Sequence, residues 1–525
     1  MKRICAAVLI LILTLCACSG QQQGDEPGVT PAPAATEGGT LSVGVYNFDT
    51  YNPIATQSQS MTQVSAFIYD GLMRKNSDYT MSPCLAESYT VSDNGLTYTF
   101  SLRQDVTWHD GSGFDANDVD YTIQMIQELD SSPYKDRLAN VSAARRADRY
   151  TYIITLREAN AGFINLMDFP IIKNGTDCTE GLKEYIPVGT GAYQYTPSDM
   201  SRSLRLVRNE AYTAGEKPLI EEVIIKQVPD KAALTTALEV REVSAVPFTA
   251  QELMNYNPRG NLYTVSYPNN NLTFLGINTT RTVLSDARVR RALSYAIGRE
   301  EIEQNIMFGR GESVHVPTAP NSYLYKDIYR LEESADRAAE LLAEAGYSAG
   351  ADGVQVHGTS GEALRFNLLV NSDNERRTAI AEAIKTDLQR IGVEVTVEGV
   401  SFEEYQRRVN AGNYDMFLGE VKIGADLDLS MFAGQNARYS VYASERIDSL
   451  LWNCKNAVTQ EAFAQTYQEL EEAFLEEMPI ISLLMGMDAM MLNDTVQGVG
   501  TPAEGSVFAG AAGWYITSPQ ATAGQ

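Results

Sequence analysis

Strand-like and helix-like segments alternate between residues 364 and 421, and no other feature restricts the possible folds of this chain as strongly. Apolar residues at every second position predict strands, and apolar residues at helical spacing predict the helices between them. The predicted order is strand Leu364–Val370, helix Asn374–Ile391, strand Glu394–Val397, helix Phe402–Asn410 and strand Tyr414–Val421. Strands and helices that alternate in this way are typical of α/β proteins with a parallel or mixed sheet.

The remainder of the chain predicts elements of the same two kinds. Asp93-Asn94-Gly95 separates two alternating runs, and because Asn and Gly accept positive φ, we expect a β-hairpin over Tyr89–Leu102. Asp115 or Asn117 can cap a helix that continues to Leu129. Further elements are predicted as strands over Thr40–Tyr46, Arg149–Leu156, Leu204–Val207, Ile220–Val228, Leu272–Ile277 and Pro479–Met485, and as helices over Gln63–Met73, Lys231–Val240, 286–307, Ser334–Gly346, Ser444–Trp452 and Gln460–Glu477.

The start of the chain has the pattern of a bacterial export signal. Two basic residues precede an apolar run from Ile4 to Leu15, which is shorter than the roughly 20 residues of a membrane-spanning helix. Leu15 and Ala17 stand before Cys18 as in a lipoprotein processing site. We expect residues 1–17 to be removed and Cys18 to be lipidated. The lipid then anchors the protein at the extracytoplasmic face of the cell membrane, in the periplasm where the host has an outer membrane. Ordinary secretion with cleavage nearby is the alternative.

Residues 18–39 predict a flexible tether, because they contain almost no large apolar side chain and are rich in Gln, Gly, Pro, Ala and Thr. About 485 residues follow, which exceeds the ~250–300 residues at which one hydrophobic core stops growing. We therefore expect more than one lobe. The net charge of −26 argues against nucleic acid or anionic lipid as a partner, since both require a basic surface.

Nothing in the sequence indicates a catalytic or metal centre. The cysteines after the tether are Cys84, Cys178 and Cys454, and the histidines are His109, His315 and His357. The three cysteines allow at most one disulfide, and neither residue type occurs at a paired metal-binding spacing. GxSxG, Walker and dinucleotide-binding motifs are also missing from the sequence. We expect a protein that is not an enzyme and holds no cofactor or metal; an extracytoplasmic hydrolase is the competing reading.

A series of short motifs resembles the peptide-type, family 5 solute-binding proteins of ABC importers, from Thr40 to about Asp494. The motifs are weak singly and specific in this order and spacing. They are Ile68-Tyr69-Asp70-Gly71-Leu72, Cys84-Leu85-Ala86-Glu87, Gly95-Leu96-Thr97-Tyr98-Thr99-Phe100, Trp108-His109-Asp110-Gly111, Phe114-Asp115-Ala116-Asn117-Asp118-Val119, Val188-Gly189-Thr190-Gly191, Asp286-Ala287-Arg288-Val289-Arg290-Arg291-Ala292-Leu293 and the segment 336–347. We interpret them as structural: turns, helix caps and packing positions.

The resemblance implies an α/β, periplasmic-binding-protein-like fold (type II, cluster C) with two lobes, mixed sheets and a two-segment hinge. Lobe one is expected over residues 40–271 with an inserted subdomain at about 60–185, and lobe two over 272–478. Residues 479–525 return to lobe one and form the C-terminal tail. The hinge segments are expected near Leu272–Asn278 and Pro479–Met485. A monomer of this kind closes on a peptide, leaves it unaltered and delivers it to an ABC permease.

In this family an extended peptide pairs its backbone with the walls of the cleft. Gln57, Ser58 and Gln59 match the position that supplies this pairing in lobe one. Tyr134 falls near a position that can line the cleft, where a tyrosine offers an apolar face and one polar tip.

Lobe two departs from the pattern of the family. Peptide binders often carry a tryptophan, an aspartate for the ligand's ammonium and a proline after a Tyr-Asp strand, and here the tryptophan and the proline are missing. Asp426 reaches the ammonium position only with two extra residues before it, and without that shift Gly424 occupies the position. Alternation places Glu420 and Lys422 on one face, where they could hold a zwitterion. A solvated strand edge with a local ion pair is the alternative.

Other solute classes remain open at this stage, namely a nickel complex, an opine or an oligosaccharide. Few histidines disfavour nickel, unless a chelator carries it. Trp108, Trp452 and Trp514 are the only tryptophans that could stack on a sugar. A receptor that senses a peptide and signals to a partner would share all of these sequence features.

Overall fold

The computed structural model describes residues 35–178, 185–197, 202–254, 256, 259–434 and 437–517. The expected signal peptide, Cys18 and most of the tether lie outside these residues. Among the described residues, none of the helices combines the length and the apolar character that crossing a membrane requires.

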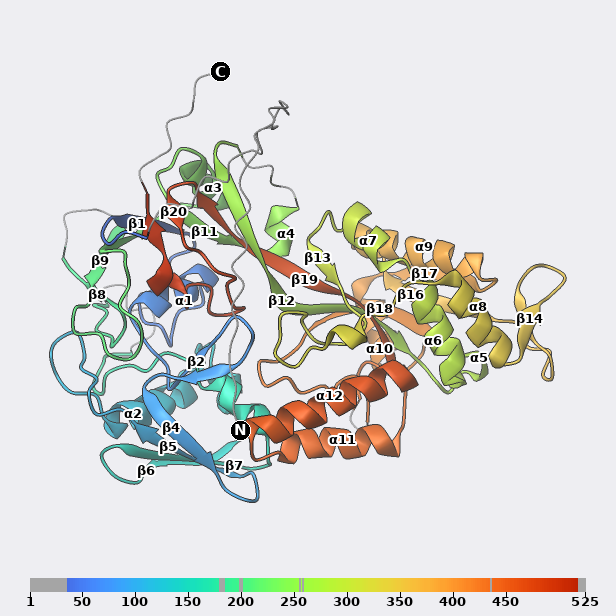
Figure 1. The fold of residues 1–525 in the computed structure, drawn as a ribbon, viewed down its shortest axis with the longest axis horizontal. Helices are drawn as coiled ribbons and strands as arrows, with labels where there is room; N and C mark the ends of the chain where they lie inside the picture. The colour runs from blue at the N-terminus through green and yellow to red at the C-terminus, as the bar shows by residue number, and fades with distance from the viewer. Residues whose placement is uncertain are drawn as a thin grey trace, which may run out of the picture. The chain divides into compact units, whose positions relative to one another are not determined.

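Two long neighbouring strands organise the structure from Thr36 onward. β12 (Leu262–Ile277) and β19 (Ile480–Asn493) pair antiparallel, from Leu262 opposite Asn493 to Gly276 opposite Ile480. Figure 1 shows them running side by side from the part that holds β1 and β11 to the part that holds β16, β17 and β18. They contain the two predicted hinge segments, Leu272–Asn278 and Pro479–Met485, except for the end residues Asn278 and Pro479. The exact lobe boundaries stay a prediction, and the names lobe one and lobe two are used here with the ranges given above.

One mixed sheet of eleven strands passes through both lobes in the described residues. Its order is β17-β16-β18-β12-β19-β11-β1-β10-β9-β8, and β13 pairs with β19. The pairs β1–β10, β1–β11, β16–β17 and β16–β18 are parallel, and the other pairs of this sheet are antiparallel. A separate antiparallel sheet in the order β4-β5-β7-β6 lies within the range predicted for the inserted subdomain, a name that is kept below for this region. The predicted mixed α/β architecture is therefore confirmed.

The remaining elements have the following bounds in the described residues. The strands are β1 (Thr40–Val45), β2 (Met73–Lys75), β3 (Met81–Pro83), β4 (Ala86–Val91), β5 (Thr97–Leu102), β6 (Val141–Arg146), β7 (Thr151–Leu156), β8 (Tyr193–Tyr195), β9 (Ser203–Arg208), β10 (Glu222–Gln227), β11 (Ala245–Phe248), β13 (Gly311–Ser313), β14 (Tyr347–Ala349), β15 (Gln355–His357), β16 (Arg365–Asn371), β17 (Glu394–Val400), β18 (Met416–Lys422), β20 (Val496–Gln497) and β21 (Tyr515–Ile516). The α-helices are α1 (Gln59–Val64), α2 (Ala116–Glu128), α3 (Lys231–Glu239), α4 (Ala250–Leu253), α5 (Thr282–Ser285), α6 (Ala287–Ala296), α7 (Arg299–Asn305), α8 (Ala335–Glu344), α9 (Glu375–Arg390), α10 (Phe402–Asn410), α11 (Glu445–Asn456) and α12 (Gln460–Glu477).

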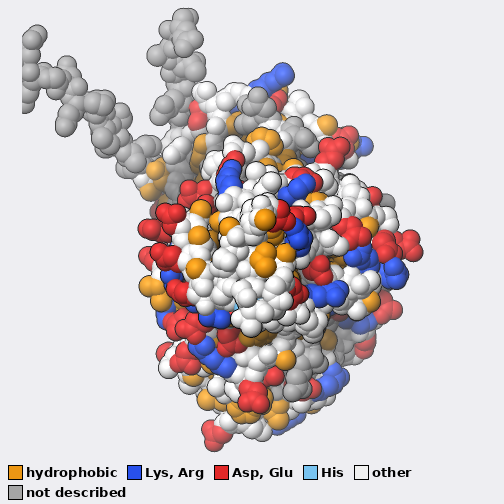
Figure 2. Space-filling view, turned by 90° about the vertical axis from the view of Figure 1, so that its right-hand side faces the viewer, with side chains coloured by type: hydrophobic (Ala, Val, Ile, Leu, Met, Phe, Trp, Pro, Cys, Tyr) orange, Lys and Arg blue, Asp and Glu red, His pale blue; other side chains and the backbone are white. Residues whose placement is uncertain are grey.

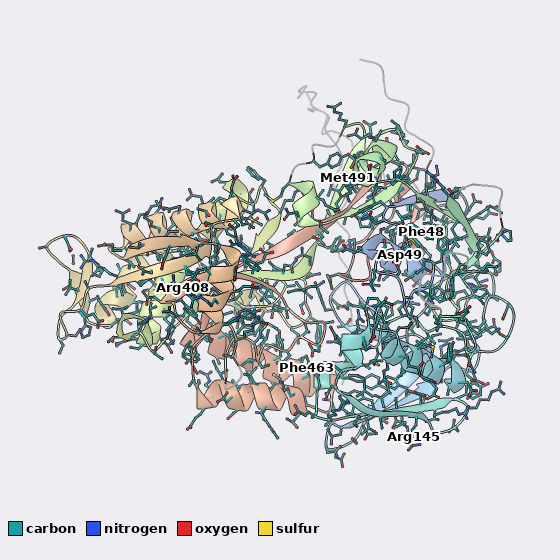
Figure 3. The ribbon with its side chains drawn as sticks, turned by 180° about the vertical axis from the view of Figure 1, so that it is seen from behind. Phe48, Asp49, Arg145, Arg408, Phe463 and Met491 are labelled. Carbon is teal, nitrogen blue, oxygen red and sulfur yellow. The ribbon has the colours of Figure 1, made fainter. Side chains whose placement is uncertain are left out.

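Strand β18 shows why the sheet of lobe two is covered on both faces. Successive side chains of a strand point to opposite faces. Met416 and Leu418 join an apolar cluster with α6, α8 and α9, whereas Phe417 joins a second cluster with α11 and α12. In lobe one, Met491 of β19 packs with α3 and β11 (Figure 3). The apolar runs that predicted these strands are thus buried between helices.

Helix starts follow the caps visible in the sequence. The carboxylate of Asp115 accepts a hydrogen bond from the Asn117 amide, and the carboxylate of Asp118 accepts one from the Asp115 amide. Ser334 and Asn374 cap α8 and α9 with their side chains, which accept from the Arg337 and Arg377 amides. These predicted helices therefore begin within one residue of their predicted starts.

The predicted helix Gln63–Met73 is wrong. Helix α1 ends at Val64, a 3₁₀ turn covers Ser65–Phe67, and Met73 begins β2. The segment after the 3₁₀ turn is instead held by backbone hydrogen bonds to distant residues. The Asp70 carbonyl accepts from the Ile171 amide, and the Gly71 carbonyl accepts from the Leu85 amide. A Cβ at Gly71 would lie 2.8 Å from the carbonyl carbon of Asp168, so this close passage requires glycine.

The single long helix predicted over 286–307 is also wrong, because α6 ends at Ala296 and α7 starts at Arg299. Ile297 between them is extended (φ −81°, ψ 120°). The Asp387 carboxylate accepts from the Gly298 amide at 2.9 Å, and the buried guanidinium of Arg299 donates to the Ser294 carbonyl at 2.8 Å. These contacts satisfy the backbone groups that the break exposes.

Acidic and basic side chains are interspersed on the face of the molecule shown in Figure 2. That face therefore carries no basic patch for nucleic acid, in agreement with the net charge of −26 of the whole chain.

Candidate functional site

A cavity of about 350 Å³ lies where the paired strands β12 and β19 pass between the lobes. Its walls come from β12, β18 and β19, from the first turns of α4 and α9, and from the loop that holds Glu504. Lobe one contributes Gln59, Gln251 and Glu504, and lobe two contributes Arg377 and Glu420. The cavity is therefore bounded by both lobes and by the strands that join them.

The floor of the cavity is a polar stretch of β12. The pairing with β19 shifts between Pro268 and Leu272, and Asn270 in this irregularity has a φ of 60°. Its carbonyl accepts from the Ile423 amide at 2.9 Å, which connects the stretch to the end of β18. Asn269 and Asn271 on either side line the cavity. The break in the ladder thus turns amide side chains toward the space between the lobes.

Asp488 on β19 is held by this polar stretch. Its Oδ1 accepts from Asn269 Nδ2 at 2.7 Å and from the Ala250 amide at 2.8 Å. Burial raises the pKa of Asp488, and the charge of Glu504 raises it further, while the two hydrogen bonds and Lys422 oppose the rise. Gly486 lets Asn269 approach, since a Cβ there would lie 2.6 Å from the Asn269 Oδ1.

Two ion pairs line the cavity, and each has one member on β18. Arg377 Nη2 lies 3.2 Å from Glu420 Oε2, and Lys422 Nζ pairs with Glu504 Oε1. The second pair joins β18 of lobe two to the loop of lobe one, and its lysine is 60% exposed. An exposed pair of this kind contributes about 0–1 kcal/mol.

Two further guanidinium groups in the cavity have no carboxylate partner among the described residues. Arg376 donates to Gln251 Oε1 at 3.5 Å, and its Nε is buried without a hydrogen-bond partner. Arg310, next to β13, has no ion pair with any described residue. Positive and negative groups therefore face the same space, and two of the positive groups, Arg310 and Arg376, have no carboxylate partner among the described residues.

Of the site residues predicted from the sequence, Gln59, Glu420 and Lys422 come together in this cavity, and the alternation that placed the last two on one face is confirmed. Ser58 is the N-cap residue of α1, and its hydroxyl donates to the Tyr46 carbonyl at 3.2 Å. The Gln57 side chain donates to the Ser131 carbonyl. Gln57 and Ser58 directly precede Gln59 in the sequence, but they do not line the cavity.

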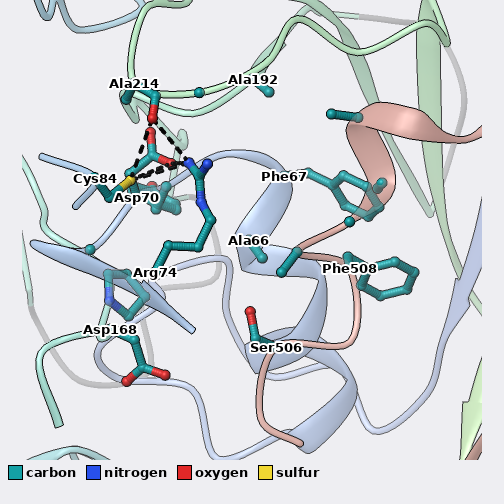
Figure 4. A pocket seen from close by; sticks show the side chains of 18 of the residues that line it. Ala66, Phe67, Asp70, Arg74, Cys84, Asp168, Ala192, Ala214, Ser506 and Phe508 are labelled. Atoms are coloured by element: carbon teal, nitrogen blue, oxygen red, sulfur yellow. Dashed lines mark hydrogen bonds and ion pairs between the residues drawn. The ribbon is translucent and has the colours of Figure 1, made fainter. Parts of the chain in front are cut away.

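Tyr134 lines a different cavity, of about 520 Å³, inside lobe one. Figure 4 shows the charged groups of that cavity, in which Arg74 donates to Asp70 at 3.0 Å and to Cys84 at 3.2 Å. Asp168 pairs with Arg137, whose guanidinium stacks 5.1 Å from the centre of the Tyr134 ring. Because these charges satisfy one another, the smaller cavity between the lobes is the better candidate for a charged ligand.

Gly424 and Asp426 lie in the loop after β18 and do not line the cavity between the lobes. Asp426 Oδ2 accepts from Asn160 Nδ2 at 3.2 Å, so the side chain faces the inserted subdomain. Burial raises the pKa of Asp426 and the hydrogen bond from Asn160 opposes the rise. The role of both residues in ligand binding stays a prediction.

Sequence reasoning missed Asn269, Asp488, Arg310 and Arg376. Two signals could have indicated the first pair: three consecutive asparagines follow Pro268 inside a strand, and Asp488 is the one charged residue of the apolar strand β19. The two arginines stand in loop and helix positions whose surroundings depend on the tertiary fold.

No cluster of three or more His, Cys, Asp or Glu that could hold a metal ion occurs in the part of the chain that the structure describes. Cys84, Cys178 and Cys454 are buried free thiols. His109 contacts Gly189 and Gly191, and the ring of His357 lies edge-to-face with that of Tyr347. Burial lowers the pKa of His315 to about 2, so it is neutral at physiological pH.

Comparison with known proteins identifies the family. The sequence model described as "Bacterial extracellular solute-binding proteins, family 5 Middle" matches residues 80–437. The oligopeptide-binding protein AppA of Bacillus subtilis is 23% identical over 94% of each chain. The glutathione-binding protein GsiB of Salmonella typhimurium is 26% identical over 84% of this chain and 87% of its own. The structure of HbpA2 from Haemophilus parasuis matches with a TM-score of 0.76 at 22% identity, over 91% of this chain and all of that chain.

These matches confirm the predicted two-lobed, periplasmic-binding-protein-like fold. They also confirm the resemblance drawn from the motifs, since the matched region contains most of them. The chain belongs to the bacterial extracellular solute-binding proteins of family 5, the solute-binding components of ABC importers.

Proposed function

We propose that this protein captures short peptides in the cavity between β12, β18 and β19 and delivers them unaltered to the permease of an ABC importer. The observation that carries the proposal is the charge pattern of the cavity, where unpaired groups of both signs face one space bounded by both lobes. A peptide with free ends is a zwitterion and matches this pattern. The oligopeptide-binding relative from Bacillus subtilis supports the same ligand class.

The edge of β18 supports recognition of a peptide backbone. The ladder between β16 and β18 joins only Leu368 to Met416 and Leu369 to Phe417. Beyond Phe417, that edge of β18 has no strand partner among the described residues. An extended peptide can add to such an edge through main-chain hydrogen bonds, which give affinity with little dependence on side chains.

Capture couples to closure because the ligand would touch both lobes. Glu420 and Arg377 belong to lobe two, whereas Gln59 and Gln251 belong to lobe one. A solute that bridges them stabilises the closed arrangement by the difference in its affinity for the two states. Closure then produces the form that a permease can recognise.

The N-terminal sequence completes the proposal. Lipidation at Cys18 and the tether over residues 18–39 would keep the monomer at the extracytoplasmic face of the membrane, close to the permease. The family is extracytoplasmic, in agreement with this location. We assign no catalytic residue and no cofactor to the protein.

Thermal unfolding with candidate solutes tests the proposal. We expect di- to hexapeptide mixtures to raise the unfolding midpoint of the purified protein by several degrees, since a ligand that binds only the folded state stabilises it by mass action. Nickel–histidine, haem, glutathione and oligosaccharides serve as the other arms. Mass spectrometry of the recovered peptide checks that it is unaltered.

A matched pair of variants connects the shift to the cavity. Glu420→Gln removes the partner of Arg377 inside the cavity, whereas Glu404→Gln removes an exposed partner of Arg407 on α10. We expect the first to reduce the peptide-induced shift and the second to leave it unchanged. A shift with oligosaccharides alone, or conversion of the peptide to a product, contradicts the proposal.

A further inference from the structure

The ionisable groups of the cavity between the lobes divide into paired and unpaired members. Glu420 pairs with Arg377 and Glu504 with Lys422. The members that remain are one carboxylate and two guanidinium groups, namely Asp488, Arg310 and Arg376. A charge held in a partly desolvated site without a partner costs free energy, so these three groups require an account.

Asp488 uses one of its two carboxylate oxygens for the protein. Oδ1 accepts both hydrogen bonds, from Asn269 and from the Ala250 amide, and both donors are uncharged. Oδ2 accepts no hydrogen bond from any described residue. Lys422, whose charge lowers the pKa of Asp488, is already paired with Glu504. The hydrogen bonds to Oδ1 therefore hold the carboxylate in place, and Oδ2 is left to accept a hydrogen bond from a ligand.

Backbone and side-chain hydrogen bonds connect the two unpaired arginines to the neighbours of Asp488. The carbonyl of Arg310 accepts from the Met487 amide at 3.1 Å, one residue from Asp488. Arg376 contacts Gln251, and the neighbouring Ala250 donates to Asp488. Guanidinium groups bind carboxylates through parallel hydrogen bonds. A single small ligand can therefore meet Asp488 and the arginines at once.

Asp426, the predicted acid for the ammonium of a peptide, is committed elsewhere. Its carboxylate accepts from Asn160, and the backbone of Gly162 packs directly against its carbonyl. The residue is therefore part of the junction between lobe two and the inserted subdomain. The cavity requires another acid for a cationic group, and Asp488 is the free one.

We propose that Asp488 Oδ2 binds the ammonium group of the ligand and that Arg310 and Arg376 bind its carboxylate. The ligands are then short peptides in which both ends are free, held by their ends across the cavity. This inference rests on the proposed function and adds to it the direction in which the peptide lies and the requirement for two unblocked ends.

Three mixtures of tripeptides with uncharged side chains test the inference: one with free ends, one N-acetylated and one C-amidated. Each mixture is dialysed against the full chain, and the retained peptides are measured by mass spectrometry. We expect the wild-type protein to retain free-ended peptides roughly ten- to hundredfold better than either blocked form, as the loss of a charge-assisted hydrogen bond predicts.

Two sets of variants test separately the preference for a free amino end and the preference for a free carboxylate. Asp488→Asn keeps the acceptor for Asn269 and Ala250 but removes the charge, so it should lose the preference for a free amino end and keep the preference for a free carboxylate. Arg310→Gln with Arg376→Gln should show the reverse. The preference that each variant keeps, for a free carboxylate in Asp488→Asn and for a free amino end in the arginine variant, shows that the variant is folded. Asp426→Asn should behave as the wild-type protein at both ends.

The outcomes separate the two proposals. Equal retention of free and blocked tripeptides by the wild-type protein overturns the assignment of the ends and leaves the proposed peptide binding intact. Loss of amino-end preference in Asp426→Asn, or its persistence in Asp488→Asn, also overturns the assignment. Failure to retain any of the three mixtures overturns the proposed peptide binding, and the assignment with it.

Discussion

Asn160 Nδ2 donates to Asp426 Oδ2 at 3.2 Å, and this hydrogen bond joins the inserted subdomain to the loop after β18. The junction continues through Gly162, which lies against the Asp426 backbone, and through Phe463 of α12, which packs near Tyr98 and Ala161 (Figure 3). A residue expected to bind ligand thus takes part in the contact between two regions far apart in the sequence.

Asn160→Ala should destabilise the protein by about 1 kcal/mol at pH 7, because the half-buried Asp426 loses its donor. Burial already raises the pKa of Asp426, and loss of Asn160 raises it further. The destabilisation should therefore grow as the pH rises and the carboxylate ionises, and shrink on acidification. Urea unfolding at several pH values measures it. Asn456→Ala, which removes an exposed helical contact, is the control; equal losses in both variants contradict the prediction.

Gly162→Ala should loosen the same junction through sterics alone. A Cβ at this position would lie 2.0 Å from the Asp426 carbonyl oxygen, and backbone on both sides cannot yield as a flexible side chain can. We expect a loss of stability of about 1–3 kcal/mol, typical of overpacking. Gly113→Ala in the same subdomain meets no atom within 4 Å and serves as the matched control. Comparable unfolding midpoints for the two variants would show that the junction is not tight.

The sequence predicted most elements of the fold, because apolar periodicity and caps are local properties. Helix α12 occupies Gln460–Glu477 as expected, and α9 begins at the cap Asn374. The helix predicted over Gln63–Met73 failed because its apolar residues are buried by distant backbone near Asp168, which local pattern does not reveal.

The candidate site was only partly accessible to the same reasoning. Glu420 and Lys422 followed from alternation along one strand. The positions of Asp488 and Arg376 depend on which strand of lobe one meets which helix of lobe two, and that pairing is a long-range property. Even so, a lone carboxylate within the apolar strand β19 is a signal that can be read before the structure, because such a group needs a partner.

The three cysteines of the described residues should resist alkylation in the folded protein. Cys84, Cys178 and Cys454 are buried and free, and burial raises the pKa of each thiol. A thiol with a raised pKa supplies little of the reactive thiolate. Peptide mapping after iodoacetamide should find all three unmodified in native protein and modified after denaturation. A disulfide between any two of them in the mapped peptides contradicts the structure.

Glu471 on α12 should make the stability of the protein depend on pH in the neutral range. Its side chain is fully buried, Oε1 accepts from Thr318, and Oε2 has no hydrogen-bond partner in the described residues. Burial raises the pKa of Glu471 from 4.5 to about 8. Between these values the unfolded state has lost the proton and the folded state keeps it, so stability falls as the pH rises from 4.5 and levels off above 8.

Glu471→Gln keeps the neutral shape at every pH and should remove this part of the pH dependence. We expect the variant to match the wild-type protein near pH 5 and to exceed it by several kcal/mol at pH 9, since each pH unit between the two pKa values contributes about 1.4 kcal/mol. Urea unfolding at pH 5, 7 and 9 measures the difference. Glu472→Gln removes a neighbouring exposed carboxylate paired with Lys326 and should change stability by less than about 1 kcal/mol throughout. Parallel pH profiles for the wild-type protein and Glu471→Gln would mean that Glu471 ionises normally in the folded state.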